Sequence, residues 1–301
     1  MKVHIYDFRW TDETTVEFQA SRENKFGKKQ VHTNDDFSVE ICSEVYCAGN
    51  RIDDIWVSCS EKAQGRSKCE ICKQKEQRET FVFTTFDGFN QEFLKPEDLE
   101  KITGSHIVYL AFFDKNLIKV GVSKKERKRI RQLEQGSLAT LFIAETPNGI
   151  EARKIETILK KNGIVDKIQG DQKKGIIIPE ISTMEIQKIL EEVLKKQKNE
   201  FPREYEILKK YFSETPEFIS WEQKYNIQYL QENKKPLHMI ELKKGEWVSG
   251  KIRSIRGSFL VIETPEELVG FNAKDLQGYD GEFDAKTPGL KTNIALQNTL
   301  F

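Results

Sequence analysis

All five cysteines of this 301-residue chain lie between positions 42 and 72, and this cluster constrains the fold more than any other feature. Cys69 and Cys72 form a Cys-x-x-Cys pair, preceded by Cys59 and Cys47 at separations of ten and twelve residues. Structural zinc takes four thiolates in a tetrahedron, and a site with four cysteine ligands has no open position for water. We therefore expect Cys47, Cys59, Cys69 and Cys72 to bind a structural Zn²⁺ ion, with Cys42 as an alternative to Cys47.

The cysteine cluster is also informative about the cellular compartment of the protein. In a reducing compartment, cysteines grouped this closely favour metal binding over disulfides. The first residues, MKVHIYDFRW, alternate like a strand and lack the apolar segment of a signal peptide, and no apolar run is long enough to span a membrane. We expect a cytoplasmic protein without a membrane partner.

The charge of the chain is balanced. Lys plus Arg and Asp plus Glu both number 48, so the formal net charge is zero. A balanced chain has no overall attraction to nucleic acid, so any such interaction must depend on local basic patches. Aromatic residues make up 10% of the chain, which excludes a disordered protein despite the high content of charged residues.

Hydrophobic periodicity predicts an α+β protein with three regions. Residues 1–100 are predicted to be β-rich, with strands at TVEFQA, FSVEIC and FVFTTF around the cysteine cluster of residues 42–72. Residues 101–235 are predicted to form a small sheet flanked by helices. Residues 236–301 are predicted to form a small β domain with a C-terminal tail, and EWVSGKIRSIRGSFLVIET predicts a hairpin there around Arg256 and Gly257.

The central region contains the clearest helix signals. A helix is predicted from Lys124 to Gln135, closed by Gly136, and a second one after Pro147 and Asn148. Between them, LATLFIAET predicts a strand.

Two further helices are predicted toward the end of the central region. Ser182 and Glu185 have the spacing of a capping box before the amphipathic segment IQKILEEVLKKQ. Another helix is predicted over REYEILKKYF.

The segment IVYLAFFDKNLIKVGVS, residues 107–123, predicts an antiparallel hairpin. With a turn at residues 114–116, Tyr109 pairs with Gly121, and Lys119 shares the face of Tyr109. A tyrosine and a lysine on one face indicate a polar site there. The alternative is an edge hairpin with one solvated face.

The next segment, KKERKRIR, has six basic side chains in eight positions. Guanidinium groups match phosphate oxygens in their fork geometry, so a basic helix beside a polar sheet face is a candidate phosphate site. The alternative is a solvated charged face. The candidate nucleic-acid-binding residues are Lys124, Lys125, Arg127, Lys128 and Arg129. Farther on, Glu156 in EARKIETILKK is a candidate ligand for Mg²⁺ or Mn²⁺.

The order of these elements resembles the GIY-YIG nuclease superfamily. IVY, residues 107–109, is similar to the first signature, and KVG, residues 119–121, to the second, with Lys119 in place of the second tyrosine. The resemblance implies a small sheet flanked by helices and a metal-dependent endonuclease. In that superfamily a tyrosine assists deprotonation of water, an arginine steadies the phosphate and a glutamate holds the metal. The site residues implied are Tyr109, Lys119, Arg131 and Glu156.

The chain also resembles an uncharacterised group of archaeal and bacterial proteins with a cysteine-rich zinc insert ahead of a divergent GIY-YIG-like domain. The segments that carry this resemblance, in order, are YCAGN, Cys59, CEIC, VYLAFF, KVGVS, RQLEQGS and SGKIRSIRGSFLVI. They extend over most of the chain. The resemblance implies an architecture more than a biochemical role.

The sequence ends in QNTLF, which resembles the short peptides that bind sliding clamps. In such peptides a glutamine enters a polar pocket and the apolar side chains fill an adjacent one. Gln297, Leu300 and Phe301 are the candidate clamp-binding residues. The alternative is a tail that docks on its own domain.

Two functions follow as expectations. The first is a nucleic-acid-binding protein that cleaves phosphodiesters in DNA or RNA with Mg²⁺ or Mn²⁺. The second is a non-catalytic zinc-containing adaptor that binds DNA or RNA through the same basic face. A protein-binding scaffold is a third, weaker reading.

Overall fold

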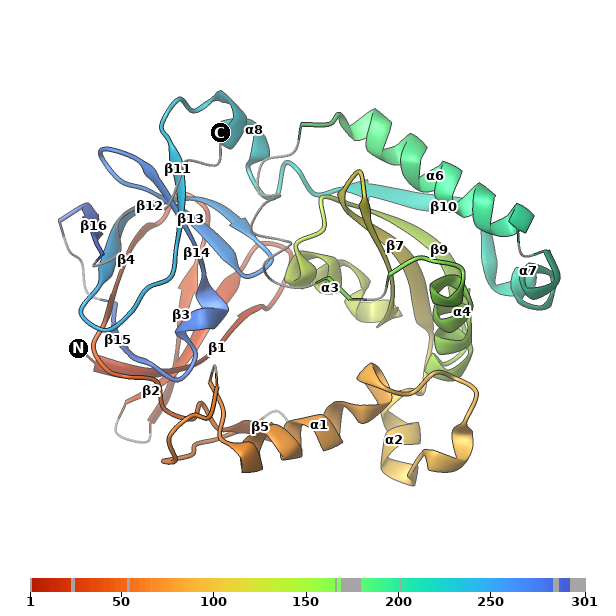
Figure 1. Cartoon of the computed structure of the whole chain (residues 1–301), viewed down its shortest axis with the longest axis horizontal. Coiled ribbons are helices and arrows are strands. Elements are labelled where there is room, and N and C mark those ends of the chain that lie inside the picture. Colours follow the sequence, from red (N-terminus) through yellow and green to blue (C-terminus); the bar gives the residue numbers. More distant parts are fainter. Residues whose placement is uncertain are drawn as a thin grey trace. The chain divides into compact units, whose positions relative to one another are not determined.

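The computed structural model describes most of the chain, and the statements below concern that part. The described residues are 2–22, 25–52, 55–65, 67–165, 167–168, 180–200, 202–283 and 287–292. The protein is α+β, as expected (Figure 1). It divides into two compact units, which we call the terminal unit (Met1–Glu79 with Lys224–Phe301) and the central unit (Thr80–Gln223).

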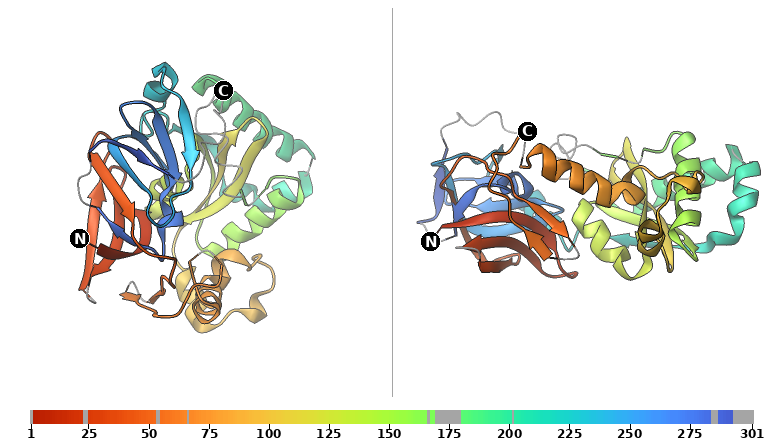
Figure 2. Two further views of the ribbon diagram at one scale, coloured as in Figure 1. Left: turned by 60° about the vertical axis from the view of Figure 1, so that its left-hand side comes forward. Right: turned by 90° about the horizontal axis from the view of Figure 1, so that it is seen from below.

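The terminal unit contains a ten-stranded sheet in the order β11-β14-β13-β12-β4-β15-β1-β2-β3, with β16 paired to β12. Its strands are β1 (Lys2–Trp10), β2 (Val16–Arg22), β3 (Lys25–Val31), β4 (Asp36–Ile41), β11 (Leu237–Ile240), β12 (Trp247–Arg256), β13 (Phe259–Glu263), β14 (Leu268–Asn272), β15 (Asp280–Glu282) and β16 (Gly289–Lys291). Strands from the two ends of the chain lie side by side in this sheet, as the red and blue ribbons of Figure 2 show. The expected C-terminal β region therefore shares its sheet with the N-terminal one.

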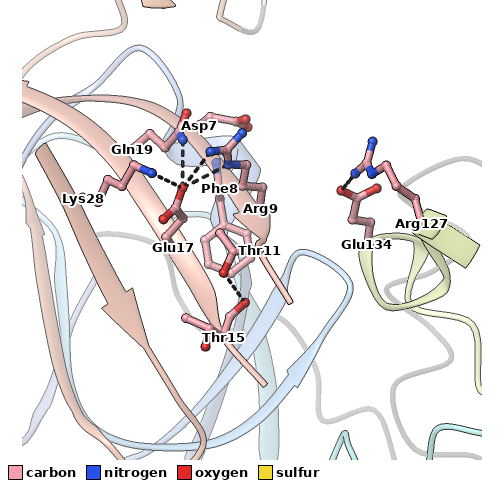
Figure 3. A network of polar contacts seen from close by, with 10 residues as sticks. All are labelled: Asp7, Phe8, Arg9, Thr11, Thr15, Glu17, Gln19, Lys28, Arg127 and Glu134. Atoms are coloured by element: carbon pink, nitrogen blue, oxygen red, sulfur yellow. Dashed lines mark hydrogen bonds and ion pairs between the residues drawn. The ribbon is translucent and has the colours of Figure 1, made fainter. Parts of the chain in front are cut away.

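The core of the terminal unit is aromatic. The ring centroids of Phe8 and Phe18 are 4.8 Å apart, and those of Phe18 and Phe37 are 5.8 Å apart. On β2 the carboxylate of Glu17 is buried as well, and it accepts hydrogen bonds from Arg9 and Gln19 at 2.9 to 3.0 Å (Figure 3). The predicted hairpin at the end of this unit is confirmed as β12 and β13, and a short helix, α8 (Ile227–Glu232), precedes β11.

The cysteine cluster ends in a long helix, since Cys69 directly precedes this helix and Cys72 lies in its first turn. A two-stranded sheet, β5 (Asn50–Ile52) and β6 (Ile55–Val57), is followed by α1 (Glu70–Thr84), within which the boundary between the units falls. The strand predicted at FVFTTF is wrong, because Phe81–Thr84 continue α1. Helix propagation costs far less than nucleation, so the helix formers of residues 70–80 carry the helix into this apolar segment.

The central unit has a four-stranded antiparallel sheet in the order β10-β9-β7-β8. Its strands are β7 (His106–Asp114), β8 (Leu117–Lys124), β9 (Ala139–Thr146) and β10 (Phe212–Ser220). Its helices are α2 (Pro96–Lys101), α3 (Lys128–Gln135), α4 (Gly149–Lys161), α6 (Thr183–Glu200) and α7 (Pro202–Leu208), with 3-10 turns at Gln91–Phe93, Lys125–Arg127 and Lys209–Tyr211. The helix expected over REYEILKKYF therefore ends earlier than predicted, and its last residue, Phe212, begins β10.

Three predicted helix ends of the central unit are confirmed, whereas the helix predicted from Lys124 begins at Lys128, after the 3-10 turn of Lys125–Arg127. Gly136 adopts a left-handed conformation with φ 73° at the end of α3. The side chain of Asn148 accepts a hydrogen bond from the backbone N–H of Glu151 and so caps α4. Ser182 and Glu185 form the expected capping box, with the Glu185 carboxylate accepting from the backbone N–H of Ser182 at 3.2 Å.

Two remaining predictions concern the tail and the membrane. Gln297, Leu300 and Phe301 lie outside the described residues, so the clamp-binding tail stays a prediction. Among the helices that the structure describes, none is long and apolar enough to cross a membrane.

Candidate functional site

Four of the five cysteines converge in the terminal unit. One sulfur atom from each of Cys47, Cys59, Cys69 and Cys72 lies within 4.8 Å of the other three. Cys59 Sγ and Cys69 Sγ are 3.9 Å apart, close to the roughly 3.8 Å that tetrahedral geometry requires for metal–sulfur bonds of about 2.3 Å. Cys42 is not part of the group, and its thiol lies 3.7 Å from the carbonyl oxygen of Glu40. The four sulfur atoms could hold a metal ion, with Cys47 rather than Cys42 as the first ligand.

The local backbone is shaped around these sulfur atoms. The backbone N–H groups of Gly49 and Cys69 donate to Cys47 Sγ at 3.4 and 3.2 Å. Gly49 has φ 75°, and a Cβ atom there would lie 2.1 Å from the Val57 carbonyl oxygen, so only glycine fits this position. Burial raises the pKa of the Cys72 thiol, whereas the backbone N–H of Cys72 lowers the pKa of Cys69. Donation to sulfur favours the thiolate, the form that binds metal.

In the central unit, the hairpin of β7 and β8 has the expected register. Tyr109 pairs with Gly121, and Ala111 pairs with Lys119, although an irregularity between Phe112 and Asp114 shortens the predicted turn. The alternative of a solvated hairpin face does not hold. Tyr109 is fully buried in a core cluster with Ile107, Ala111, Phe113 and Phe142, and β9 pairs with the other edge of β7.

Gly121 is needed because the ring of Tyr109 crosses over it. A Cβ atom at position 121 would lie 2.5 Å from the Tyr109 hydroxyl oxygen and 2.6 Å from Cζ. No side chain fits beside a packed aromatic ring at that separation. Gly121 of KVG and Tyr109 of IVY therefore pack directly against each other.

The Tyr109 hydroxyl lies in a polar group within this core. Gln135 Nε2 donates to the hydroxyl oxygen at 2.7 Å. Burial raises the pKa of Tyr109, the guanidinium of Arg131 lowers that pKa, and the carboxylate of Glu156 raises it. Two of the other three predicted catalytic residues, Arg131 and Glu156, are thus close enough to Tyr109 to act on its hydroxyl electrostatically.

Two glutamines of α3 were missed in the sequence. Gln132 and Gln135 are both buried, and Gln132 Oε1 accepts from Thr140 Oγ1 at 3.2 Å. Thr140 Oγ1 in turn accepts from Trp221 Nε1 at 3.0 Å. The available signal was their spacing of three, which places two amides on the core side of a helix next to Leu133.

The fourth predicted residue, Lys119, is half-buried on β8. The neighbouring backbone N–H of Val120 donates to the carbonyl oxygen of Val165 at 2.9 Å, and Lys119 forms a parallel bridge with Val165. The backbone of Lys119 is therefore covered by the segment that follows α4.

The predicted nucleic-acid-binding residues lie on β8, the following 3-10 turn and α3. Four of them are ion-paired, and Figure 3 shows one pair, Arg127 with Glu134 at 2.7 Å. The others are Lys125 with Glu145 at 2.6 Å, Lys128 with Glu217 at 2.5 Å and Arg129 with Glu217 at 3.7 Å. Arg131 shares Glu134 with Arg127, at 3.4 Å. Exposed pairs of this kind contribute little to stability, so a phosphate can replace the carboxylate at low cost.

Glu156 does not fit a divalent cation in this structure. It is buried, and its carboxylate accepts from Arg153 Nη1, while Arg153 Nη2 donates to the Phe83 carbonyl oxygen. A Mg²⁺ or Mn²⁺ ion needs several oxygen ligands and keeps most of its waters. The prediction that Glu156 holds such an ion is therefore not supported, because the guanidinium of Arg153 already pairs with the Glu156 carboxylate.

Comparison with known proteins adds one finding. No curated protein and no solved structure matches this chain. The sequence pattern of a protein family described as "Protein of unknown function (DUF2797)" matches residues 31–280, which include the four cysteines and the whole β7–α4 segment. The match extends over most of the chain, in agreement with the expected membership of an uncharacterised family. The chain belongs to this family.

Proposed function

We propose that this protein binds nucleic acid through the central unit and carries a structural zinc ion in the terminal unit. The observation that carries the proposal is the exposed basic segment of residues 124–131, next to the hairpin that holds Tyr109. Several of its cations pair with the carboxylates of Glu134, Glu145 and Glu217, which phosphates can displace.

The order of elements supports the same proposal. The sequence β7, β8, α3, β9, α4, with β7 between β8 and β9, resembles the GIY-YIG arrangement of a signature hairpin followed by a helix, a strand and a helix. Members of that superfamily contact phosphodiesters with this part of the fold. The resemblance is one of architecture, and we extend it to phosphate binding by Arg127, Arg129 and Arg131.

Binding is tested by fluorescence anisotropy with labelled single-stranded and structured DNA and RNA at several salt concentrations. We expect an affinity that falls with salt for at least one of these polymers. In the variant Lys125→Ala/Arg129→Ala, the slope of log affinity against log salt should decrease by about 1.4 for single strands, since each phosphate contact contributes about 0.7. Lys195→Ala/Lys196→Ala on α6 removes two exposed cations of the same unit and is the matched control.

Absence of salt-sensitive binding to every polymer would end the nucleic-acid proposal. An equal effect of the control pair would show that the attraction is general and does not come from residues 124–131. In either case, the scaffold reading would gain.

Cleavage is the second candidate function, and a specific observation favours testing it. Arg131 lowers and Glu156 raises the pKa of Tyr109, so both charges act on the Tyr109 hydroxyl, as a phosphodiester site requires. The nucleic acids are incubated with Mg²⁺ or Mn²⁺ beside the variant Glu156→Ala. Metal-dependent cleavage that the variant loses would support a nuclease, whereas binding without cleavage would support an adaptor.

The identity of the metal is part of the proposal. Four thiols with sulfur separations suited to a tetrahedron favour Zn²⁺. Elemental analysis of the purified protein should find one zinc per chain. A folded protein that contains no metal would contradict this.

Binding to a sliding clamp remains a prediction from the last five residues alone. Deletion of residues 297–301 should abolish retention on an immobilised clamp. Unchanged retention would end the clamp hypothesis without affecting the rest of the proposal.

A further inference from the structure

We infer that Arg153 takes the place of a divalent cation beside Glu156, so that the central unit binds phosphate without Mg²⁺ or Mn²⁺. The part of this inference that concerns phosphate binding rests on the proposed function. The pairing of Arg153 with Glu156 does not, and it is tested independently below.

The geometry of the pair is the first argument. The exposed fractions of the Arg153 and Glu156 side chains are 15% and 10%, so both charges are largely removed from water. An uncompensated carboxylate at this depth would be costly, and a cation must accompany it. The guanidinium is that cation, and it lies within the same helix, three residues before Glu156.

The second argument is that Arg153 is held from two sides. Its Nη1 donates to Glu156, and its Nη2 donates to the carbonyl oxygen of Phe83, in the last turn of α1. Carbonyl groups at the end of a helix lack partners within the helix and carry partial negative charge, so they attract a cation. The guanidinium is therefore fixed between a carboxylate and a helix terminus.

A neighbouring pair on α4 shows what an ordinary pair looks like. Lys154 and Glu151 have the same separation of three residues and an Nζ–Oε1 distance of 2.8 Å. Both side chains are more exposed, at 26% and 23%, and within the described part of the chain Lys154 Nζ donates to Glu151 of its own helix. A planar guanidinium can bridge two acceptors, whereas an ammonium is a point charge. Arg153 is therefore held by two acceptors, whereas Lys154 forms an ordinary ion pair nearer the surface.

The consequence concerns the reaction class. A divalent ion at Glu156 would have to displace the guanidinium and bring its waters into a core that holds the buried Tyr109. The guanidinium of Arg131 acts on the Tyr109 hydroxyl, and Arg153 compensates the charge of Glu156. A phosphate bound by the basic segment of residues 124–131 therefore requires no divalent ion at Glu156.

The test uses the full chain with its zinc retained and Mn²⁺ as the paramagnetic probe. Broadening of the backbone amide signals of residues 152–159 is measured in the wild type, Glu156→Gln, Arg153→Ala and Arg153→Ala/Glu156→Gln. We expect no selective broadening in the wild type. We expect broadening in Arg153→Ala that the double variant loses. Lys154→Ala is the control, and it should leave the amides around Glu156 sharp.

Two outcomes would overturn the inference. One is broadening in the wild type that Glu156→Gln removes, since Glu156 would then bind the ion with Arg153 present. The other is absence of broadening in a folded Arg153→Ala, since the freed carboxylate would then not be a cation site. If Arg153→Ala does not fold, the comparison of wild type with Glu156→Gln still decides the question.

The phosphate part has its own readout. Nucleic-acid affinity is measured in a buffer freed of divalent ions and again with added Mg²⁺. We expect affinities within twofold of each other, and a tenfold gain with Mg²⁺ would overturn this part. Absence of binding in both buffers would instead contradict the proposed function and leave the Mn²⁺ result standing.

Discussion

The cysteine cluster of the terminal unit and the polar group around Tyr109 in the central unit look alike in the sequence and differ in the structure. In the sequence, each was predicted from four residues within a few tens of positions. The four cysteine sulfurs face one another and lie within 4.8 Å. By contrast, Tyr109 accepts from Gln135, Glu156 accepts from Arg153, and Arg131 pairs with Glu134.

This difference separates a candidate metal site from a polar core. The four cysteine sulfurs have one another as neighbours, whereas the Tyr109 hydroxyl, Glu156 and Arg131 each have a separate partner. We therefore expect the local structure of the terminal unit, and not that of the central unit, to depend on a bound ion.

Replacing a ligand should have the largest effect. In Cys69→Ser, the metal content should fall below one per chain, and the free energy of unfolding should fall by roughly 5 kcal/mol or more. Elemental analysis and thermal unfolding measure the two quantities. Cys42→Ser is the matched control and should change neither, because Cys42 lies outside the cluster. Equal loss of metal in both variants would contradict the assignment of the ligands.

The packing of Tyr109 over Gly121 should come next. Gly121→Ala places a methyl group 2.5 Å from the Tyr109 hydroxyl oxygen and should lower the free energy of unfolding by about 2–4 kcal/mol. Chemical denaturation measures the change. The control is Gly27→Ala on β3, where a Cβ atom has no neighbour within 4 Å, and it should be nearly neutral. A neutral Gly121→Ala would mean that the ring does not lie there.

An ion pair of the terminal unit provides a test by pH. Glu263 accepts from Arg253 at 2.6 Å and lies 3.1 Å from Lys235. Burial opposes its ionisation, but these cations hold the pKa of Glu263 at about 2, below its ordinary value of 4.5. Because the folded-state pKa is the lower one, its contribution to stability is complete above pH 4.5 and is lost as pH falls toward 2.

The variant Glu263→Gln should therefore lose about 1–2 kcal/mol at pH 7, less than the full pKa shift implies because solvent screens pairs that reach the surface. The difference between wild type and variant should shrink between pH 4.5 and 2. Denaturation at a series of pH values measures it. Glu266→Gln, at a nearby exposed position, is the control, and a difference that is constant with pH would refute the assignment.

The smallest effect is expected at the surface of α4. Lys154→Ala removes an exposed pair with Glu151 and should cost about 0.3–0.5 kcal/mol. Arg153→Ala, three residues before Glu156, should cost several times more, since it leaves a buried carboxylate without a cation. Thermal unfolding of the two variants compares them directly. Equal costs would show that Arg153 is an ordinary surface residue.

Much of the architecture could be predicted because its signals are local. The convergence of the cysteines, the pairing of Tyr109 with Gly121, and the caps at Gly136 and Asn148 each depend on residues close in sequence. Turn chemistry and period-two alternation are enough to predict such features.

The remainder depends on contacts between distant segments. The β strands from the two ends of the chain form one sheet, and nothing in residues 236–301 alone indicates partners near residue 40. Glu145 and Glu217, which pair with the basic segment, come from β9 and β10. Phe83, whose carbonyl holds Arg153, lies in a segment predicted as a strand. The partners of the charged residues at the site were therefore not predictable, even where the residues themselves were.

The most direct test of nucleic-acid binding is the affinity of the 301-residue protein for labelled nucleic acid, measured as a function of salt in buffer freed of divalent ions. A salt-sensitive affinity that added Mg²⁺ leaves unchanged, and that Lys125→Ala/Arg129→Ala weakens, is the predicted result. No binding to any polymer, or binding that appears only when Mg²⁺ is added, would contradict it.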